Sequence, residues 1–172
     1  MEGEIWLVIG PMYSGKTTTL FDYLKHFADK KCILLKYALD NRYGNEEVVV
    51  SHDLVKHKAL CVKNLDIELD YDVICIDEGQ FFPDIVNFCE KCAALGKKVI
   101  VSALSADYKR EPFPNISNLI SKAERIIHKR AICGCSKNAA FSFRLTEERD
   151  VVLLGGADKY KPVCRACFFR LK

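Results

Sequence analysis

One segment near the amino end of the sequence combines glycines, a lysine and a hydroxyl residue in a spacing that suits phosphate binding. Residues 10–17 read GPMYSGKT, which matches the pattern G-x-x-x-x-G-K-[S/T]. Gly10 and Gly15 permit tight turns, so that successive backbone N–H groups point toward phosphate oxygens. Lys16 can reach the β- and γ-phosphates, and the Thr17 hydroxyl can ligate Mg²⁺. The pattern predicts a nucleoside triphosphate site made of Gly10, Pro11, Met12, Tyr13, Ser14, Gly15, Lys16, Thr17 and Thr18.

A pair of carboxylates closes an apolar segment further along the chain. Asp77 and Glu78 follow the residues VICI, and Val73–Asp77 is expected to form a buried strand. Beside a phosphate loop, such an aspartate helps to hold Mg²⁺, and a following glutamate can take the proton of an attacking hydroxyl or water. Alone, the pair would more often be an exposed turn. Together the two motifs predict use of a nucleoside triphosphate, and they leave a kinase, an ATPase and a helicase core open.

These motifs need strands and helices that bring them together. Short apolar runs give the expected strands Ile5–Ile9, Cys32–Tyr37, Val73–Asp77, Val99–Leu104 and the shorter Val48–Ser51. Helical patterns run from about Lys16 to Phe27 and from Asp84 to Leu95, with Asp84 as an N-cap and Gly96 as a C-cap. The alternation predicts an α/β fold, in which helices cover both faces of a parallel sheet.

The pattern changes after about residue 130, where two pairs of cysteines flank short β-rich runs. We therefore expect a P-loop α/β domain over residues 1–130 and a small β-rich module over residues 131–172. Two close pairs of thiolates suit a tetrahedral structural zinc ion, and a small β module needs such a crosslink. The alternative is a set of reduced structural thiols. The candidate zinc ligands are Cys133, Cys135, Cys164 and Cys167.

Other cysteines in the chain are expected to be apolar core groups. Cys89 and Cys92 have C-x-x-C spacing, but they lie in the expected helix on the face of Ile85. Cys32 and Cys75 lie within apolar strands and are interpreted in the same way. The histidines show no ligand spacing, and His52 receives no role.

Composition limits the class of protein. The sequence has 49% hydrophobic and 28% charged residues and a formal charge of +3, which favours a folded domain over a disordered or membrane protein. The small basic excess argues against a nucleic-acid surface. Glu2 and Glu4 stand where a secretory signal would be positive, and the apolar run that follows is too short to span a bilayer. A cytoplasmic protein without a membrane or nucleic-acid partner is expected.

Five segments together resemble the type II thymidine kinases. These are residues 10–17 (GPMYSGKT, with Tyr13 where Phe is usual), 36–43 (KYALDNRY), 77–84 (DEGQFFPD), 110–113 (REPF) and 155–160 (GGADKY). They occur in the order of that family, and the similarity runs from about Ile5 to Cys167. The resemblance implies a RecA-like P-loop fold with a small zinc module. In that family two C-x-x-C pairs hold the zinc, whereas the first pair here is C-x-C, one residue shorter.

The resemblance implies transfer of the γ-phosphate of ATP to the 5′-hydroxyl of thymidine, giving dTMP. Glu78 would be the general base, and Lys16 would hold the transferred phosphoryl group. Thr17 and Asp77 would serve Mg²⁺. Further cofactor contacts would come from Asp40, an outer partner of the ion, from the positive charge of Arg42 and from Gln80. Without the resemblance, Arg42 would be interpreted as a solvated loop charge.

The resemblance also implies a nucleoside pocket. Phe81, Tyr108 and Phe113 would flank the nucleoside, although such aromatic residues are by themselves more often core. The thymine methyl group would lie among Met12, Leu104 and Tyr160. A lasso-like loop would present its backbone to the base, through Val151, Leu153, Leu154, Gly155 and Gly156. Members of this family are cytosolic homotetramers inhibited by dTTP, and both properties are expectations here.

Three alternatives stay open at this point. A P-loop kinase could act on deoxyuridine or deoxycytidine, since a methyl group is worth only about 1–3 kcal/mol of discrimination. A nucleic-acid-stimulated P-loop ATPase is disfavoured by chain length and charge. A zinc-binding interaction domain without catalysis is disfavoured by the intact phosphate loop and the Asp77–Glu78 pair.

Overall fold

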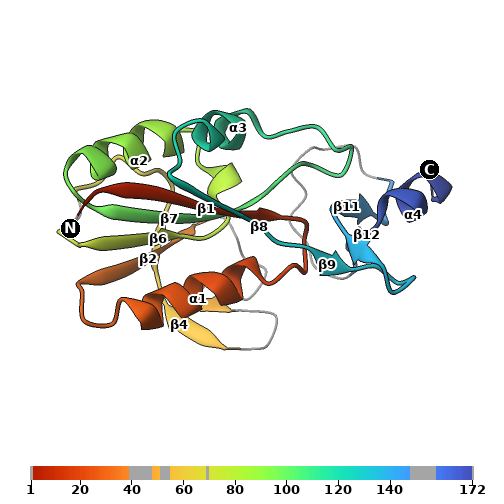
Figure 1. The fold of residues 1–172 in the computed structure, drawn as a ribbon, viewed down its shortest axis with the longest axis horizontal. Helices are drawn as coiled ribbons and strands as arrows, with labels where there is room; N and C mark the ends of the chain where they lie inside the picture. Colours follow the sequence, from red (N-terminus) through yellow and green to blue (C-terminus); the bar gives the residue numbers. More distant parts are fainter. Residues whose placement is uncertain (1, 39–47, 51–54, 69, 148–157, 172) are drawn as a thin grey trace.

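A central parallel sheet organises the molecule. The computed structural model describes residues 2–38, 48–50, 55–68, 70–147 and 158–171. Six strands form the sheet in the order β5-β2-β6-β7-β1-β8 (Figure 1). All its pairings are parallel. The strands are β1 (Glu4–Gly10), β2 (Cys32–Tyr37), β5 (Leu60–Val62), β6 (Val73–Ile76), β7 (Lys98–Leu104) and β8 (Arg125–His128).

Helices cover both faces of this sheet, as the alternation of patterns predicts. On one face lie α2 (Ile85–Ala94) and α3 (Pro114–Ile120), and on the other lies α1 (Lys16–His26) (Figure 1). A hairpin of β3 (Val48–Val50) and β4 (Lys56–Lys58) contributes to the α1 side. Along β1, Ile5 and Leu7 pack toward α2, whereas Val8 packs toward α1. This period of two buries the sheet from both sides.

The strand order places the phosphate loop and the Asp77–Glu78 pair at the same edge of the sheet, where the strands end. Parallel strands β1, β6 and β7 end at the same edge, where ligands bind in α/β folds. One strand, β7, separates β1 from β6. This arrangement is RecA-like, and it confirms the expected fold class.

A small β-rich part follows the sheet and lies beside its carboxyl edge (Figure 1). It contains two antiparallel pairs, β9 (Ala131–Ile132) with β10 (Asn138–Ala139) and β11 (Phe141–Arg144) with β12 (Tyr160–Val163). A short helix, α4 (Arg165–Arg170), closes it. Its core holds Ala131, Cys133, Ala139, Val163, Cys164 and Phe168, apart from the two clusters of the main sheet.

The sequence locates the main elements to within a residue or two. Gly96 has φ +78°, as expected for a residue that ends a helix in the left-handed conformation. Asp84 stands at the N-cap position of α2, but the expected side-chain cap is absent. Its carboxylate instead accepts a hydrogen bond from the backbone N–H of Leu65 at 2.7 Å. Asp84 therefore fastens the segment before β6 to α2.

Some elements carry no strong pattern and were not expected. The edge strands β4, β5 and β8 are short and partly exposed, and α3 and α4 are short helices. Cys75, Cys89 and Cys92 are buried apolar groups as predicted, while Cys32 is half-buried. No helix within the described ranges is long and apolar enough to cross a membrane.

Candidate active site

The phosphate loop joins β1 to α1, as its motif predicts. Gly15 has φ +75° at the N-cap of α1, a conformation that favours glycine. A Cβ on Gly10 would lie 2.6 Å from the carbonyl oxygen of Lys129, so this position also needs glycine. Tyr13 adopts φ +64° within the loop. The two glycines therefore serve the turn and the close backbone approach that phosphate binding requires.

Hydrogen bonds order the interior of this loop. The Ser14 hydroxyl and the Lys16 ammonium group each donate to the carbonyl oxygen of Pro11 at 2.8 Å. Lys16 is buried, with 8% of its surface exposed. Its charged end thus lies over the loop, where the positive end of α1 also favours an anion.

The expected metal-binding pair comes together at the end of β6. The Thr17 hydroxyl lies 3.3 Å from each carboxylate oxygen of Asp77. The buried hydroxyl of Ser102, on β7, donates to Asp77 Oδ1. Ser102 could not be predicted as a site residue from the sequence, because it is a single polar residue in an apolar strand. A carboxylate and a hydroxyl next to a phosphate loop are hard oxygen ligands of the kind that Mg²⁺ takes.

Glu78 has an unusual backbone conformation. It lies in the left-handed region at φ +54°, directly before the 3-10 turn η1 (Gly79–Phe81). Non-glycine residues held in this region cost free energy and occur often at functional sites. Gly79 packs so closely that a Cβ would lie 2.4 Å from Val101 Cγ1. The tight turn fixes where the Glu78 side chain leaves the backbone.

A hydrogen-bonded amide holds the Glu78 carboxylate. Gln80 Nε2 donates to Glu78 Oε2 at 2.6 Å, and Gln80 Oε1 accepts from the N–H of Leu104 at 3.1 Å. Asn115, at the start of α3, donates to the carbonyl oxygens of Gln80 and Phe82 at 3.1 and 2.9 Å. The structure therefore places Gln80 against Glu78, where it orients the carboxylate. Nothing in the sequence pattern distinguished Asn115.

Two of the expected nucleoside residues border one hollow at this edge of the sheet. Phe81 and Phe113 are half-buried, whereas the neighbouring Phe82 is fully buried in the core. The hollow has a volume of about 570 Å³ and is lined by Gln80, Phe81, Pro83, Val86, Asn87, Phe113, Pro114, Asn115 and Asn118. Of the adjacent pair of phenylalanines, only Phe81 thus reaches the hollow.

Tyr108 and Tyr160 both contact one arginine, Arg144. Tyr108 lies in the loop after β7, where the Asp107 carboxylate accepts the backbone N–H groups of residues 109 and 111 at 2.8 and 2.9 Å. The Arg144 guanidinium lies 3.8 Å from the centre of the Tyr108 ring. It also donates to the Tyr160 hydroxyl at 2.5 Å. Two residues distant in sequence are therefore linked through β11.

The phosphate loop also touches β11. The backbone N–H of Met12 donates to the buried Ser142 hydroxyl at 3.0 Å. Tyr13 packs against the core of the small β part. In β11, Ser142 and Arg144 lie on one face and Phe141 and Phe143 on the other. Such an alternation of polar and apolar residues would place the polar pair toward solvent, whereas the structure buries both, so the sequence carries no signal for them.

Several expected site residues fall outside the part of the chain that the structure describes. They are Asp40, Arg42, Val151, Leu153, Leu154, Gly155 and Gly156. The roles assigned to them therefore remain sequence-based predictions.

The four expected zinc ligands converge. The sulfur atoms of Cys133, Cys135, Cys164 and Cys167 all lie within 4.8 Å of one another, and those of Cys135 and Cys164 are 3.6 Å apart. Sulfurs in a tetrahedral zinc site are about 3.8 Å apart, given a Zn–S distance of about 2.3 Å. The short C-x-C turn closes with a hydrogen bond from the Ser136 N–H to the Cys133 carbonyl oxygen at 2.8 Å. The donor set and spacing fit zinc.

Hydrogen bonding within this cluster shifts the pKa values of the thiols in opposite directions. Bonds from the backbone of Cys135 and Cys164 lower the pKa of Cys133 to about 6. Bonds with Cys135, Cys133 and Cys164 raise the pKa of Cys167 to about 12. A metal cation that bound the four close sulfurs would replace the protons that they share.

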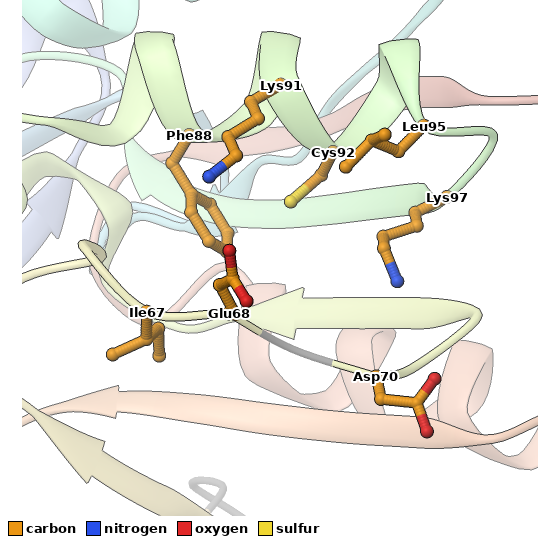
Figure 2. A pocket seen from close by; sticks show the side chains of 8 residues that line it. All are labelled: Ile67, Glu68, Asp70, Phe88, Lys91, Cys92, Leu95 and Lys97. Carbon is orange, nitrogen blue, oxygen red and sulfur yellow. The ribbon is translucent and has the colours of Figure 1, made fainter.

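A second hollow lies away from this site. It has a volume of about 360 Å³ and separates α2 from the residues that precede β6 (Figure 2). Phe88 and Cys92 face it from the helix, and the charged residues Glu68, Asp70, Lys91 and Lys97 also line it (Figure 2). Because β6 and β7 begin here, this hollow is at the opposite edge of the sheet from the phosphate loop.

The fold and the loop geometry define a P-loop nucleotide-binding α/β protein of RecA-like architecture. The sequence model of the family described as Thymidine kinase matches residues 3–168, and the chain belongs to this family. The resemblance in the sequence motifs is thereby confirmed.

Known thymidine kinases are similar in sequence to nearly the whole chain. The thymidine kinase of rabbit fibroma virus is 45% identical over 174 residues, which is 97% of each chain. That of myxoma virus, strain Lausanne, is 47% identical with the same coverage. Thymidine kinase 1 of Dictyostelium discoideum is 46% identical over 96% of this chain and 78% of its own length. Among solved structures, the Legionella pneumophila ATPase DotB has a TM-score of 0.45 at 11% identity, covering 80% of this chain and 44% of its own.

Proposed function

We propose that the protein is an ATP-dependent thymidine kinase, which transfers the γ-phosphate of ATP to the 5′-hydroxyl of thymidine and produces dTMP. The observation that carries the proposal is the position of Glu78, next to the Thr17–Asp77 pair in a chain of the thymidine kinase family. The relatives named above are thymidine kinases over the same length of chain.

The phosphate loop and Lys16 would hold the triphosphate. Phosphoryl transfer demands alignment and charge stabilisation more than covalent chemistry, and Lys16 supplies a positive charge fixed above the loop. Thr17 and Asp77 would hold Mg²⁺, which neutralises charge on the phosphates when bound. Asp40, Arg42 and Gln80 are assigned as supporting groups on this side.

Glu78 would act as the general base. Gln80 holds one carboxylate oxygen at 2.6 Å, and the carboxylate oriented in this way would accept the proton of the 5′-hydroxyl. A glutamate in this role typically contributes about 10²–10⁴-fold to a rate. The tight turn and the hydrogen bond keep the base oriented before substrate arrives.

The nucleoside would lie among aromatic residues beyond Glu78. Phe81, Tyr108 and Phe113 are assigned to its flanks, and Met12, Leu104 and Tyr160 to the thymine methyl group. The backbone of the segment with Val151, Leu153, Leu154, Gly155 and Gly156 is assigned to the base edge. Residues 131–172 are proposed to form a zinc-crosslinked module, with the kinase domain over residues 1–130.

The family further suggests a cytoplasmic homotetramer inhibited by dTTP, and we include both in the proposal. dTTP would combine the thymidine moiety and the triphosphate that this site is proposed to bind. No nucleic acid or membrane partner is proposed.

A substrate panel tests the function against the alternatives. Purified protein would be assayed with Mg-ATP and thymidine, deoxyuridine, deoxycytidine or no acceptor, with and without single-stranded DNA. We expect the highest kcat/KM with thymidine and no stimulation by DNA. A preference for deoxycytidine would indicate a kinase for another nucleoside. Phosphate release stimulated by DNA, without a nucleoside product, would move the ATPase alternative to the front.

A further inference from the structure

Arg144 is a buried arginine with unusually specific contacts. Its exposed fraction is 6%, and its guanidinium lies 3.8 Å from the centre of the Tyr108 ring and 5.2 Å from that of Tyr160. Its Nη2 donates to the Tyr160 hydroxyl at 2.5 Å. A planar guanidinium can stack on a ring and donate in its own plane at the same time, which a lysine cannot do.

Three separate elements meet at this arginine. Tyr108 belongs to the loop after β7, Tyr160 begins β12, and Arg144 ends β11. The register of the β11–β12 pair places Arg144 directly opposite Tyr160. Arg144 thus joins the small β part to the Tyr108 loop of the main sheet. Arg110 of the same loop makes a second contact, since its guanidinium lies 4.7 Å from the centre of the Phe168 ring.

The strand that carries Arg144 is itself fixed. Ser142, two residues earlier on the same face, accepts the N–H of Met12 in the phosphate loop at 3.0 Å. On the opposite face, Phe141 and Phe143 pack edge-to-face against Phe168 at 5.9 and 5.8 Å between ring centres. Contacts on both faces of β11 therefore determine where the guanidinium lies.

We propose that Arg144 is a positioning residue for the nucleoside, which holds Tyr108 and Tyr160 in the orientation that binds it. This inference rests on the proposed function, which assigns both tyrosines to the nucleoside. Aromatic side chains that are fixed before binding lose less entropy when the ligand arrives. Because Arg144 contacts both tyrosines that are assigned to the nucleoside, we expect its effect to fall on nucleoside binding more than on ATP binding.

Steady-state kinetics with both substrates test this role. The variants are Arg144→Met, which keeps the length without charge or plane, and Arg144→Lys, which keeps the charge. Arg125→Met is the matched control, because Arg125 is exposed on β8 and stacks on Trp6 at 4.8 Å, away from the site. Thermal unfolding of each variant shows whether the fold is kept.

For Arg144→Met we expect a KM for thymidine that is about tenfold higher, the scale of one stacking contact and one hydrogen bond. The KM for ATP should stay within about twofold, and Arg144→Lys should be intermediate. Arg125→Met should behave as wild type. An unchanged KM for thymidine, or an equal rise of both KM values, would overturn the proposal.

A second pair of variants keeps the test decisive if Arg144→Met does not fold. Tyr160→Phe removes only the hydroxyl that accepts from Arg144. If the two groups act together, adding Arg144→Lys to Tyr160→Phe should raise the KM for thymidine by less than the product of the single effects. Multiplicative effects would contradict the proposal. Wild-type protein that does not phosphorylate thymidine would instead reject the proposed function itself.

Discussion

At the residue scale, the side chain of Gln80 connects the Glu78 carboxylate to the backbone of β7 through two hydrogen bonds. Gln80 accepts the N–H of Leu104 and donates to the carboxylate, so the end of β7 fixes the orientation of the proposed base. Hydrogen bonds to charged groups are worth about 1.5–3 kcal/mol, and their geometry requires the amide. A side chain that only shaped the pocket would not need both polar atoms engaged.

The substitution Gln80→Met keeps the length of the side chain and removes both polar atoms. We expect kcat to fall about tenfold, since one charged hydrogen bond is lost, while both KM values stay within about twofold. Asn64→Met, at an exposed bend, is the matched control. Steady-state kinetics decide the matter: a raised KM for thymidine with unchanged kcat would make Gln80 a nucleoside contact and not a support for Glu78.

At the scale of elements, β11 joins the phosphate loop to the small β part. The Ser142 hydroxyl accepts the Met12 N–H in a buried position, where an unsatisfied donor costs about 1–3 kcal/mol. The loop therefore depends on a residue 130 positions away in sequence. Tyr13 strengthens the same contact by packing on the core of that part.

We expect Ser142→Ala to raise the KM for ATP about three- to tenfold, because the Met12 N–H loses its acceptor and the loop relaxes. The control is Ser121→Ala, since the Ser121 hydroxyl is exposed and donates to the Asn118 carbonyl oxygen in its own helix. Binding of ATP measured by calorimetry gives a second reading. Equal ATP affinity in the two variants would show that the loop holds its conformation without β11.

Elements with a strong hydrophobic pattern could be predicted from the sequence, whereas contacts between elements could not. The apolar runs gave β1, β2, β6 and β7 because both faces of a parallel sheet are buried. The edge strand β8 has three exposed residues of four, so its pattern is weak. The motif residues Thr17 and Asp77 were predictable because their types and spacing encode chemistry.

The residues that support the site carried no comparable signal. Ser102, Asn115 and Arg144 are single polar side chains whose partners lie on other elements. Their roles depend on strand order and register, which sequence periodicity does not determine. The clustering of the four cysteines was predicted, because close pairs of thiols with metal-ligand spacing are informative without the fold.

At the scale of the whole molecule, the proposed zinc site would stabilise the part of the chain whose residues we propose to act on both substrates. Among the described residues, the small β part has a core cluster of six buried residues, and its strands carry Ser142, Arg144 and Tyr160. Small units with little core commonly depend on a metal or disulfide crosslink. Loss of the metal should therefore affect stability first and both substrate sites with it.

The substitution Cys135→Ser should remove bound zinc and lower the melting temperature by roughly 5–15 °C, given about 2–4 °C per kcal/mol in a chain of this size. Cys61→Ser is the control, because Cys61 is half-buried on β5 and outside the cluster. Elemental analysis and thermal unfolding give the two readings. Purified wild-type protein without zinc, and equally stable in chelator, would reject the zinc site.

Phosphoryl transfer to thymidine with Glu78 as the base can be tested in one assay. The product formed from thymidine and ATP labelled in the γ-phosphate is compared between wild type and Glu78→Gln. We predict labelled thymidine 5′-monophosphate from wild type, and at least about 10²-fold slower formation by Glu78→Gln with both substrates still bound. No labelled nucleotide from the wild-type protein, or near-normal turnover by Glu78→Gln, would contradict the account.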